Sequence, residues 1–248
     1  MSKRHDIDHV LKSWKYESGE VTARLVRAGD GRQVLQMRID LGVLQLEPEN
    51  RPDGTRPGGA ESYFDYLLGV ALHEGDGFVL DDEQCAEADR EFVQYYHRRM
   101  CWLALREFRR AMRDADHSLS FMDFVRSCSP NEEWTASHEQ YRPFILFHRT
   151  QAAALAELED SGPESAVEAV NVGLESLRRC YLDAGIDEEQ LEDDELVERL
   201  HELRESVREH YHLGRTLAEQ LADAVAAEEF ERAAQLRDEI ARRTASRA

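Results

Sequence analysis

The side chains best suited to catalysis or metal binding in this 248-residue sequence are its ten histidines and four cysteines. His97 and Cys101 are four residues apart, which places both on one face of a helix, but a zinc site needs further ligands from elsewhere. His201-Glu-Leu-Arg-Glu205 is close to the HExxH pattern of metalloproteases, yet glutamate replaces the second zinc-binding histidine. We therefore expect no metal site.

A second candidate for chemistry combines His73 with the loop at residues 47–59. His73 precedes a glutamate and a Gly-Asp-Gly sequence, which favours a partly exposed acid–base pair. The loop holds three of the six prolines and is either a plain linker or a structured turn that presents Arg51, Asp53 and Arg56 to a ligand or a partner. No Gly-x-Ser-x-Gly sequence is present. We expect no catalytic residue and no cofactor.

Charge limits the partners of the chain. It carries 51 acidic and 31 basic side chains, a formal net charge of −20. Such a chain repels phosphate backbones, so direct nucleic-acid binding is not expected and a protein partner is favoured. The acidic run at residues 187–195 lacks the alternating ligands and central glycine of a calcium loop, and it predicts a solvated connector or helix N-terminus.

Hydropathy and cysteine spacing predict a cytoplasmic protein. The N-terminus has no apolar signal segment, and no apolar run is long enough to span a membrane. The cysteines form no CxxC pair, so in a reducing compartment they are expected to be small buried residues.

The elements that would position these residues are mainly helical, with a small N-terminal β-hairpin. Val21–Val26 and Val34–Leu46 are rich in β-formers, and Asp30-Gly31 suits the tight turn between them. Alternation after Val34 predicts one buried and one solvated face. Helical patterns are expected at residues 1–13, 62–72, 81–116, 142–159, 163–182, 196–225 and 230–241. The apolar side of the long 81–116 segment comprises Phe92, Tyr95, Tyr96, Arg99, Trp102, Leu103, Leu105 and Phe108.

Three regions are expected from these patterns. Residues 1–60 form the β-hairpin and its Pro/Gly-rich loop, residues 61–185 an α-helical domain, and residues 186–248 an acidic connector followed by long helices. The helices around Ser161-Gly-Pro163 resemble one tetratricopeptide-type pair, with small residues at Ala154 and Ala166 where the helices approach. Because the pair is not repeated, we predict a helical, weakly tetratricopeptide-like middle and no solenoid.

The C-terminal region has a coiled-coil-like rhythm. Apolar residues recur every three or four positions at Leu196, Leu200, Leu203, Val207, Tyr211, Leu217, Leu221 and Val225. Such a stripe needs a covering surface. A second amphipathic helix, with Phe230, Ala233, Ala234, Arg237 and Ile240, is expected to supply it after an acidic corner. The two segments predict an antiparallel helical hairpin in which Phe230 folds under the corner as a plug.

This hairpin resembles the UVR motif. The segment from Leu217 to Arg242, and above all Glu-Glu-Phe-Glu-Arg-Ala-Ala-Gln-Leu-Arg-Asp-Glu-Ile at residues 228–240, is similar to the motif of the UvrB and UvrC subunits of bacterial nucleotide-excision repair and of McsA-type activators of protein arginine kinase. The resemblance implies a docking module in which two hairpins pair through apolar positions near the corner. The implied contact residues are Leu221, Val225, Phe230, Ala233, Ala234, Arg237 and Ile240.

The resemblance is confined to this hairpin. The chain has no GxxxxGK[ST] phosphate loop, no paired CxxC sequences and no GIY-YIG nuclease motif, so no activity of those relatives is implied. We expect a non-catalytic adaptor that binds a UVR-motif protein or a second copy of itself, in DNA repair or in stress regulation. The alternative is a ligand-binding protein or hydrolase with a site between the N-terminal hairpin, the 47–59 loop and the helices.

Overall fold

The computed structural model describes residues 6–75 and 77–245. Their contacts group into two compact units, residues 1–152 and 153–248. The predicted region boundaries at 60 and 185 stay predictions, because grouping by contacts does not test which segments fold independently. Part of the helix expected at residues 1–13 lies outside the described residues, and the remainder forms α1 (Asp8–Ser13). Among the described residues, no helix is long and apolar enough to cross a membrane.

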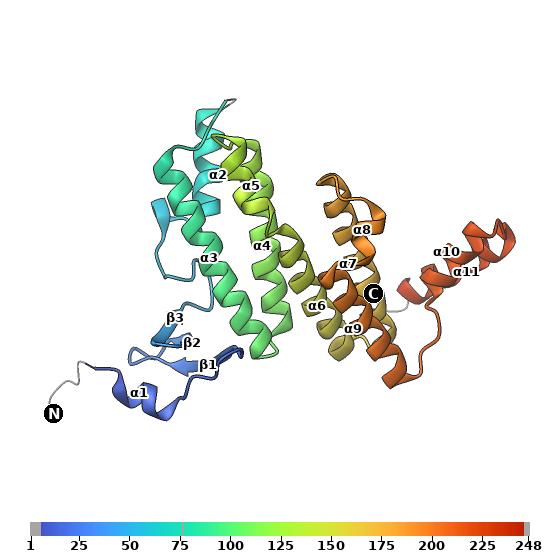
Figure 1. Cartoon of the computed structure of the whole chain (residues 1–248), viewed down its shortest axis with the longest axis horizontal. Helices are drawn as coiled ribbons and strands as arrows, with labels where there is room; N and C mark the ends of the chain where they lie inside the picture. The colour runs from blue at the N-terminus through green and yellow to red at the C-terminus, as the bar shows by residue number, and fades with distance from the viewer. Residues whose placement is uncertain (1–5, 76, 246–248) are drawn as a thin grey trace. The chain divides into compact units, whose positions relative to one another are not determined.

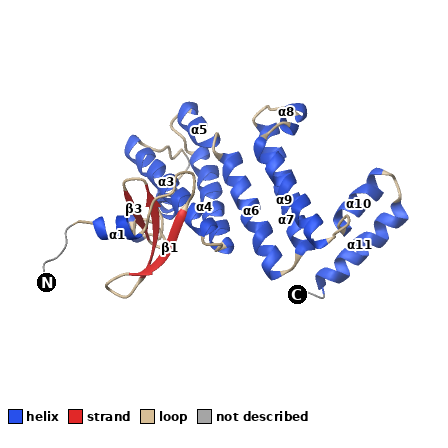
Figure 2. Cartoon of the chain, turned by 60° about the horizontal axis from the view of Figure 1, so that its bottom comes forward, coloured by secondary structure: helices blue, strands red, loops and turns tan. Residues whose placement is uncertain are grey.

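The first unit contains a small antiparallel sheet in the order β1-β2-β3 (Figure 2). Its strands are β1 (Thr22–Arg27), β2 (Gln33–Ile39) and β3 (Gly42–Leu46). The turn after β1 contains Gly31 at a φ of 90°, as Asp30-Gly31 predicted. The predicted single strand Val34–Leu46 is instead two strands, and its turn leaves Leu41 87% exposed.

The predicted alternation along β2 is wrong. Val34 and Leu35 are both buried, and so is Arg38, which was expected on the solvated face. The Arg38 guanidinium donates to the backbone carbonyls of Trp14 at 2.8 Å and Gly42 at 2.9 Å. These bonds offset the cost of burial, so a charged residue sits where the pattern predicted contact with water.

The remaining elements of the first unit are helical. They are the short 3₁₀ helix η1 (Pro57–Gly59), α2 (Tyr63–Glu74), α3 (Asp82–Ala104), α4 (Phe108–Ser127), α5 (Glu132–Glu139) and the first part of α6 (Arg142–Asp160). The 81–116 segment, predicted as one helix, is broken at residues 105–107, where Arg106 has a φ of 60°. Trp102 and Phe108 are buried on either side of the break, so the apolar period continues through it. α5 was not predicted; Asn131 caps its N-terminus.

α3 and α4 pack side by side and carry the core of this unit (Figures 1 and 2). α3 begins with a capping box between Asp81 and Gln84. Buried side chains from α2, α3 and α4 form one apolar cluster that includes Leu67, Ala88 and Phe121. The β-sheet also contacts α3. α3 is therefore the element that positions most of the buried side chains discussed below.

The second unit holds the rest of α6, then α7 (Pro163–Asp183), α8 (Glu188–Glu192), α9 (Glu195–Tyr211), α10 (Leu217–Ala226) and α11 (Phe230–Ala245). α7 begins at proline, as expected. The acidic run forms α8 and supplies Asp187 and Asp194 as N-caps of α8 and α9. The tetratricopeptide likeness of the helices around residue 162 stays a prediction.

The apolar stripe of residues 196–211 packs against a different helix from the one predicted. α9 lies along α7, and Val207 joins Ala166 and Val167 in a buried cluster. The predicted antiparallel hairpin is confirmed for α10 and α11 (Figures 1 and 2). α9 and α10 are separate helices interrupted around Gly214, so the stripe divides between two partners.

Candidate functional site

The α10–α11 hairpin closes on itself through a narrow apolar seam. Ala224, Ala233 and Leu236 are buried there, and Leu217 and Leu221 pack against them. The small alanines allow the helices to approach closely. Of the two alanines expected to permit this approach, Ala233 is buried in the seam, whereas Ala234 is exposed. The corner at residues 227–229 reverses the chain with Glu228 at a φ of 57°. The seam is complete without any large side chain at the corner.

Phe230, the first residue of α11, is therefore left outside the seam. Its side chain is 69% exposed, and Val225 on the last turn of α10 is 54% exposed. The predicted plug, in which Phe230 folds under the corner, is wrong, because most of its side chain is exposed and it does not belong to the buried seam cluster. Exposure of an aromatic ring to water is unfavourable. A partner that covers the ring therefore gains binding free energy from its burial.

The predicted contact residues fall into two groups. Val225, Phe230, Ala234 and Arg237 are exposed and accessible to a partner. Leu221, Ala233 and Ile240 are buried or half-buried. Sequence reasoning missed Ala224 and Leu236 as seam residues, although Leu236 follows Ala233 by three positions, the spacing of one helix face.

A polar contact ties the start of α10 to α7 and α9. Glu219 completes a capping box with Thr216, accepts a hydrogen bond from Asn171 at 3.1 Å, and pairs with Arg208. Partial burial alone would raise the pKa of Glu219, but the hydrogen bonds from Thr216, Asn171 and Arg208 together hold it below its ordinary value. The base of the hairpin is thus fixed by charge, while Val225 and Phe230 leave exposed apolar surface on either side of its acidic corner.

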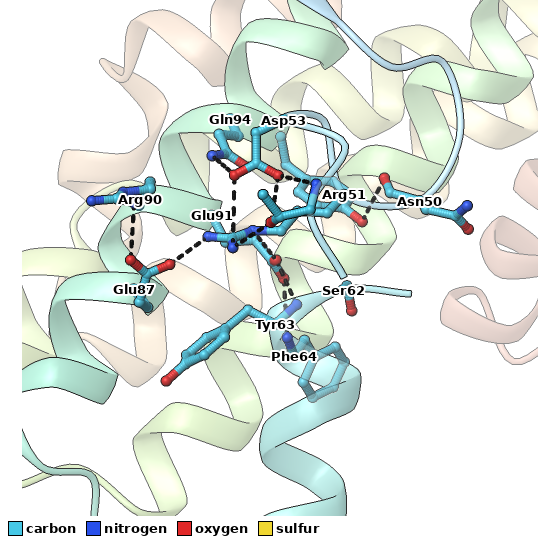
Figure 3. Close-up of polar contacts among 12 residues, drawn as sticks. Asn50, Arg51, Asp53, Ser62, Tyr63, Phe64, Glu87, Arg90, Glu91 and Gln94 are labelled. Atoms are coloured by element: carbon cyan, nitrogen blue, oxygen red, sulfur yellow. Dashed lines mark hydrogen bonds and ion pairs between the residues drawn. The ribbon is translucent and has the colours of Figure 1, made fainter. Parts of the chain in front are cut away.

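The alternative site around the 47–59 loop is built differently from the prediction. Arg51 is buried, and its guanidinium pairs with Glu87 at 2.8 Å and with Glu91 at 3.2 Å (Figure 3). Asp53 accepts hydrogen bonds from Thr55 and from Gln94 of α3. Although partial burial would raise the pKa of Asp53, these hydrogen bonds and the Arg51 charge keep it below its ordinary value. The loop is anchored to α3 by these pairs.

Glu91 is the buried centre of this network and connects it to the start of α2. Its fully buried carboxylate accepts hydrogen bonds from the backbone N–H groups of Tyr63 at 2.6 Å and Phe64 at 3.0 Å, at the start of α2 (Figure 3). His117 contributes a further contact at 3.1 Å. The carboxylate thus satisfies orphan donors of a helix N-terminus, and Arg51 balances its charge.

A cavity of about 660 Å³ opens beside the loop and is lined by Arg51 and Asp53, as predicted. His73, expected beside them, is instead exposed at the C-terminal end of α2 and does not line this cavity. The three residues therefore do not form the predicted site. Because ion pairs already engage the Arg51 guanidinium, we interpret the network as structural.

The α10–α11 hairpin is the part of the chain that matches a known family. The family model of the UvrB/uvrC motif, UVR, matches residues 215–242, which span α10 and most of α11. No curated protein and no solved structure matches the chain. The resemblance seen in the sequence is thereby confirmed, and it concerns this hairpin alone.

Proposed function

We propose that this protein is a non-catalytic adaptor that docks through its α10–α11 hairpin onto a second UVR-type hairpin. The partner hairpin belongs to a UvrB- or UvrC-like protein or to a second copy of this chain. The observation that carries the proposal is the exposed Phe230 at the corner of a hairpin whose own seam is complete without it. The UVR match supports a protein–protein contact at this place.

The free energy gained by burying the exposed apolar side chains near the corner is typical of a reversible contact. Burial of a large apolar side chain contributes about 1.5–3 kcal/mol, and Phe230 is joined by the smaller exposed surface of Val225 and Ala234. Association costs several kcal/mol in lost translational and rotational freedom, which offsets part of this gain. We expect a modest affinity with Phe230 as its main anchor.

The test uses the full-length chain, fluorescently labelled, in titrations with UvrB, with UvrC and with the unlabelled chain. Phe230→Ala should weaken the observed contact by about 1–3 kcal/mol, or roughly 5- to 150-fold, because a buried aromatic anchor is lost. Val172→Ala is the matched control, since Val172 is also an exposed apolar residue of the same unit but lies on α7.

The titrations also decide the cellular context. Binding to UvrB or UvrC that depends on Phe230 would connect the protein to nucleotide-excision repair. Binding to a UVR-bearing activator of protein arginine kinase, used as a further probe, would connect it to stress regulation. Equal affinities for the wild type and Phe230→Ala in every titration would contradict docking through the corner.

A further inference from the structure

An apolar cavity of the first unit, separate from the one beside the 47–59 loop, has a volume of about 690 Å³. It is bounded by side chains of α3, α4, α5 and α6, together with Tyr141. Its apolar lining consists of Phe92, Val93, Tyr96, Met122, Phe144 and Ile145. The volume and the predominance of aromatic and aliphatic walls are typical of a site for a small organic molecule.

One buried cation, Arg99, belongs to this wall. The side chain is 2% exposed, and its Nη1 donates a long hydrogen bond of 3.3 Å to Ser118, which also lines the cavity. Its Nε atom is buried without a hydrogen-bond acceptor. Burial lowers the pKa of Arg99 to about 10, although the Asp114 charge acts in the opposite direction. Arg99 therefore remains charged at neutral pH.

The buried carboxylates near Arg99 are already paired with other arginines. Arg98 takes both oxygens of Asp114, at 2.7 and 2.9 Å. Arg51 pairs with Glu91. Within residues 6–75 and 77–245, no ion pair is recorded for Arg99. A buried charge without a partner is costly, so this position is poorly explained by stability alone.

His97 adds a second unsatisfied polar atom to the same cavity. It lies two residues before Arg99 on α3, and its Nδ1 is buried without a hydrogen-bond partner. Burial lowers the pKa of His97, so the imidazole is neutral at pH 7. Two polar side chains, each with one buried nitrogen that has no hydrogen-bond partner, thus line one mainly apolar space. This arrangement suits a ligand with a polar head and an apolar body.

We propose that this cavity binds an organic monocarboxylate, with its carboxylate on the Arg99 guanidinium and its apolar body against the aromatic walls. A guanidinium matches the planar geometry of a carboxylate and can donate two parallel hydrogen bonds to it.

A second charged residue of the cavity lining, Asp89, favours a single negative charge on the ligand. Asp89 also lines the cavity, where it accepts a hydrogen bond from Trp134 and contacts His138 at 2.9 Å. Its carboxylate would repel a second anionic group. Nucleotides and other polyanions are therefore disfavoured relative to monocarboxylates of similar size.

The test compares octanoate with octan-1-ol, which shares the apolar chain but has no charge. Isothermal titration calorimetry on the full chain should show one octanoate site per chain, at least tenfold tighter than octan-1-ol. Arg99→Met should reduce octanoate to the affinity of octan-1-ol and leave octan-1-ol unchanged. Val93→Trp, at the exposed rim of the cavity, should weaken both ligands.

A readout on the wild type keeps the proposal testable if Arg99→Met does not fold. With ¹³C-methyl methionine, octanoate should shift the resonance of Met122, which lines the cavity, and leave Met37 of the sheet unchanged. Equal affinity for octanoate and octan-1-ol would overturn the proposal and indicate a merely apolar groove. Absence of octanoate binding at millimolar concentration, a shift confined to Met37, or a charge preference that survives in Arg99→Met would overturn it as well.

Discussion

Buried arginines occupy contrasting environments in this protein. Arg51 is matched by the carboxylates of Glu87 and Glu91, Arg98 by Asp114, and Arg38 by backbone carbonyls. Arg99 donates a long hydrogen bond to a serine hydroxyl and lies over the Tyr96 ring, and it pairs with no carboxylate of the described residues. In sequence these four residues are indistinguishable. The distinction between a structural and a ligand-binding arginine therefore depends on which acceptors the fold brings to each guanidinium.

The structural interpretation of Arg51 leads to a stability prediction. Arg51→Met should lower the free energy of unfolding by about 3–5 kcal/mol, because it leaves the buried Glu91 carboxylate without its guanidinium partner. Urea denaturation followed by circular dichroism measures the change. Arg56→Met, at an exposed position of the same loop, is the control and should change stability by less than about 0.5 kcal/mol. An unchanged denaturation midpoint in Arg51→Met would instead support the ligand-binding interpretation of the loop.

At the scale of elements, the C-terminal hairpin has two ends with different chemistry. Its base is held by the Glu219 carboxylate, which receives bonds from α7 and α9 as well as from its own N-cap. Its corner carries Phe230 without a covering side chain from the hairpin. A docking element benefits from this division, because a fixed base lowers the entropy lost when the corner is covered.

The depressed pKa of Glu219 predicts how the base responds to pH. Since the folded-state pKa lies below the ordinary value of 4.5, the ionised carboxylate contributes stability above about pH 4.5 and loses that contribution as pH falls through the folded-state pKa. Glu219→Gln should therefore be destabilised by roughly 0.5–2 kcal/mol at pH 7. The difference from the wild type should shrink at pH 3.

Urea unfolding at pH 7 and pH 3, followed by far-ultraviolet circular dichroism, measures this difference. Glu228→Gln, at the exposed corner, is the matched control and should follow the wild type at both pH values. A Glu219→Gln variant whose deficit is the same at pH 7 and pH 3 would show that the charge of Glu219 does not hold the base.

At the scale of the whole molecule, the net charge of −20 acts on every association. Two copies of the chain repel one another, and salt screens that repulsion. If the contact at Phe230 is apolar, binding should change little between 50 and 300 mM salt, and self-association should strengthen slightly. Analytical ultracentrifugation over this range measures the effect for the full chain. A large loss of binding at moderate salt would assign the contact to the acidic faces and to a basic partner.

Local patterns were sufficient for much of the C-terminal region. The acidic corner and the recurrence of apolar residues every three or four positions both belong to short segments. The two helices of a hairpin are joined by a short corner, so local signals are enough to predict that they pack together. The hairpin and its motif were therefore predictable. The position of Phe230 was not, because only the tertiary structure shows that its side chain lies outside the buried seam.

The first unit shows what only the tertiary structure decided. The break at residues 105–107 is invisible to hydrophobic periodicity, because buried Trp102 and Phe108 maintain the apolar pattern on both sides of it. Arg99 falls on the predicted apolar side of this segment, but its significance depends on Asp114 being occupied by Arg98 and on a cavity built from four helices. The sequence by itself thus determined the helical class and the UVR hairpin, since both depend on neighbours in the chain. The cavity and the buried ion pairs were decided by contacts between residues distant in sequence, whose partners no local pattern specifies.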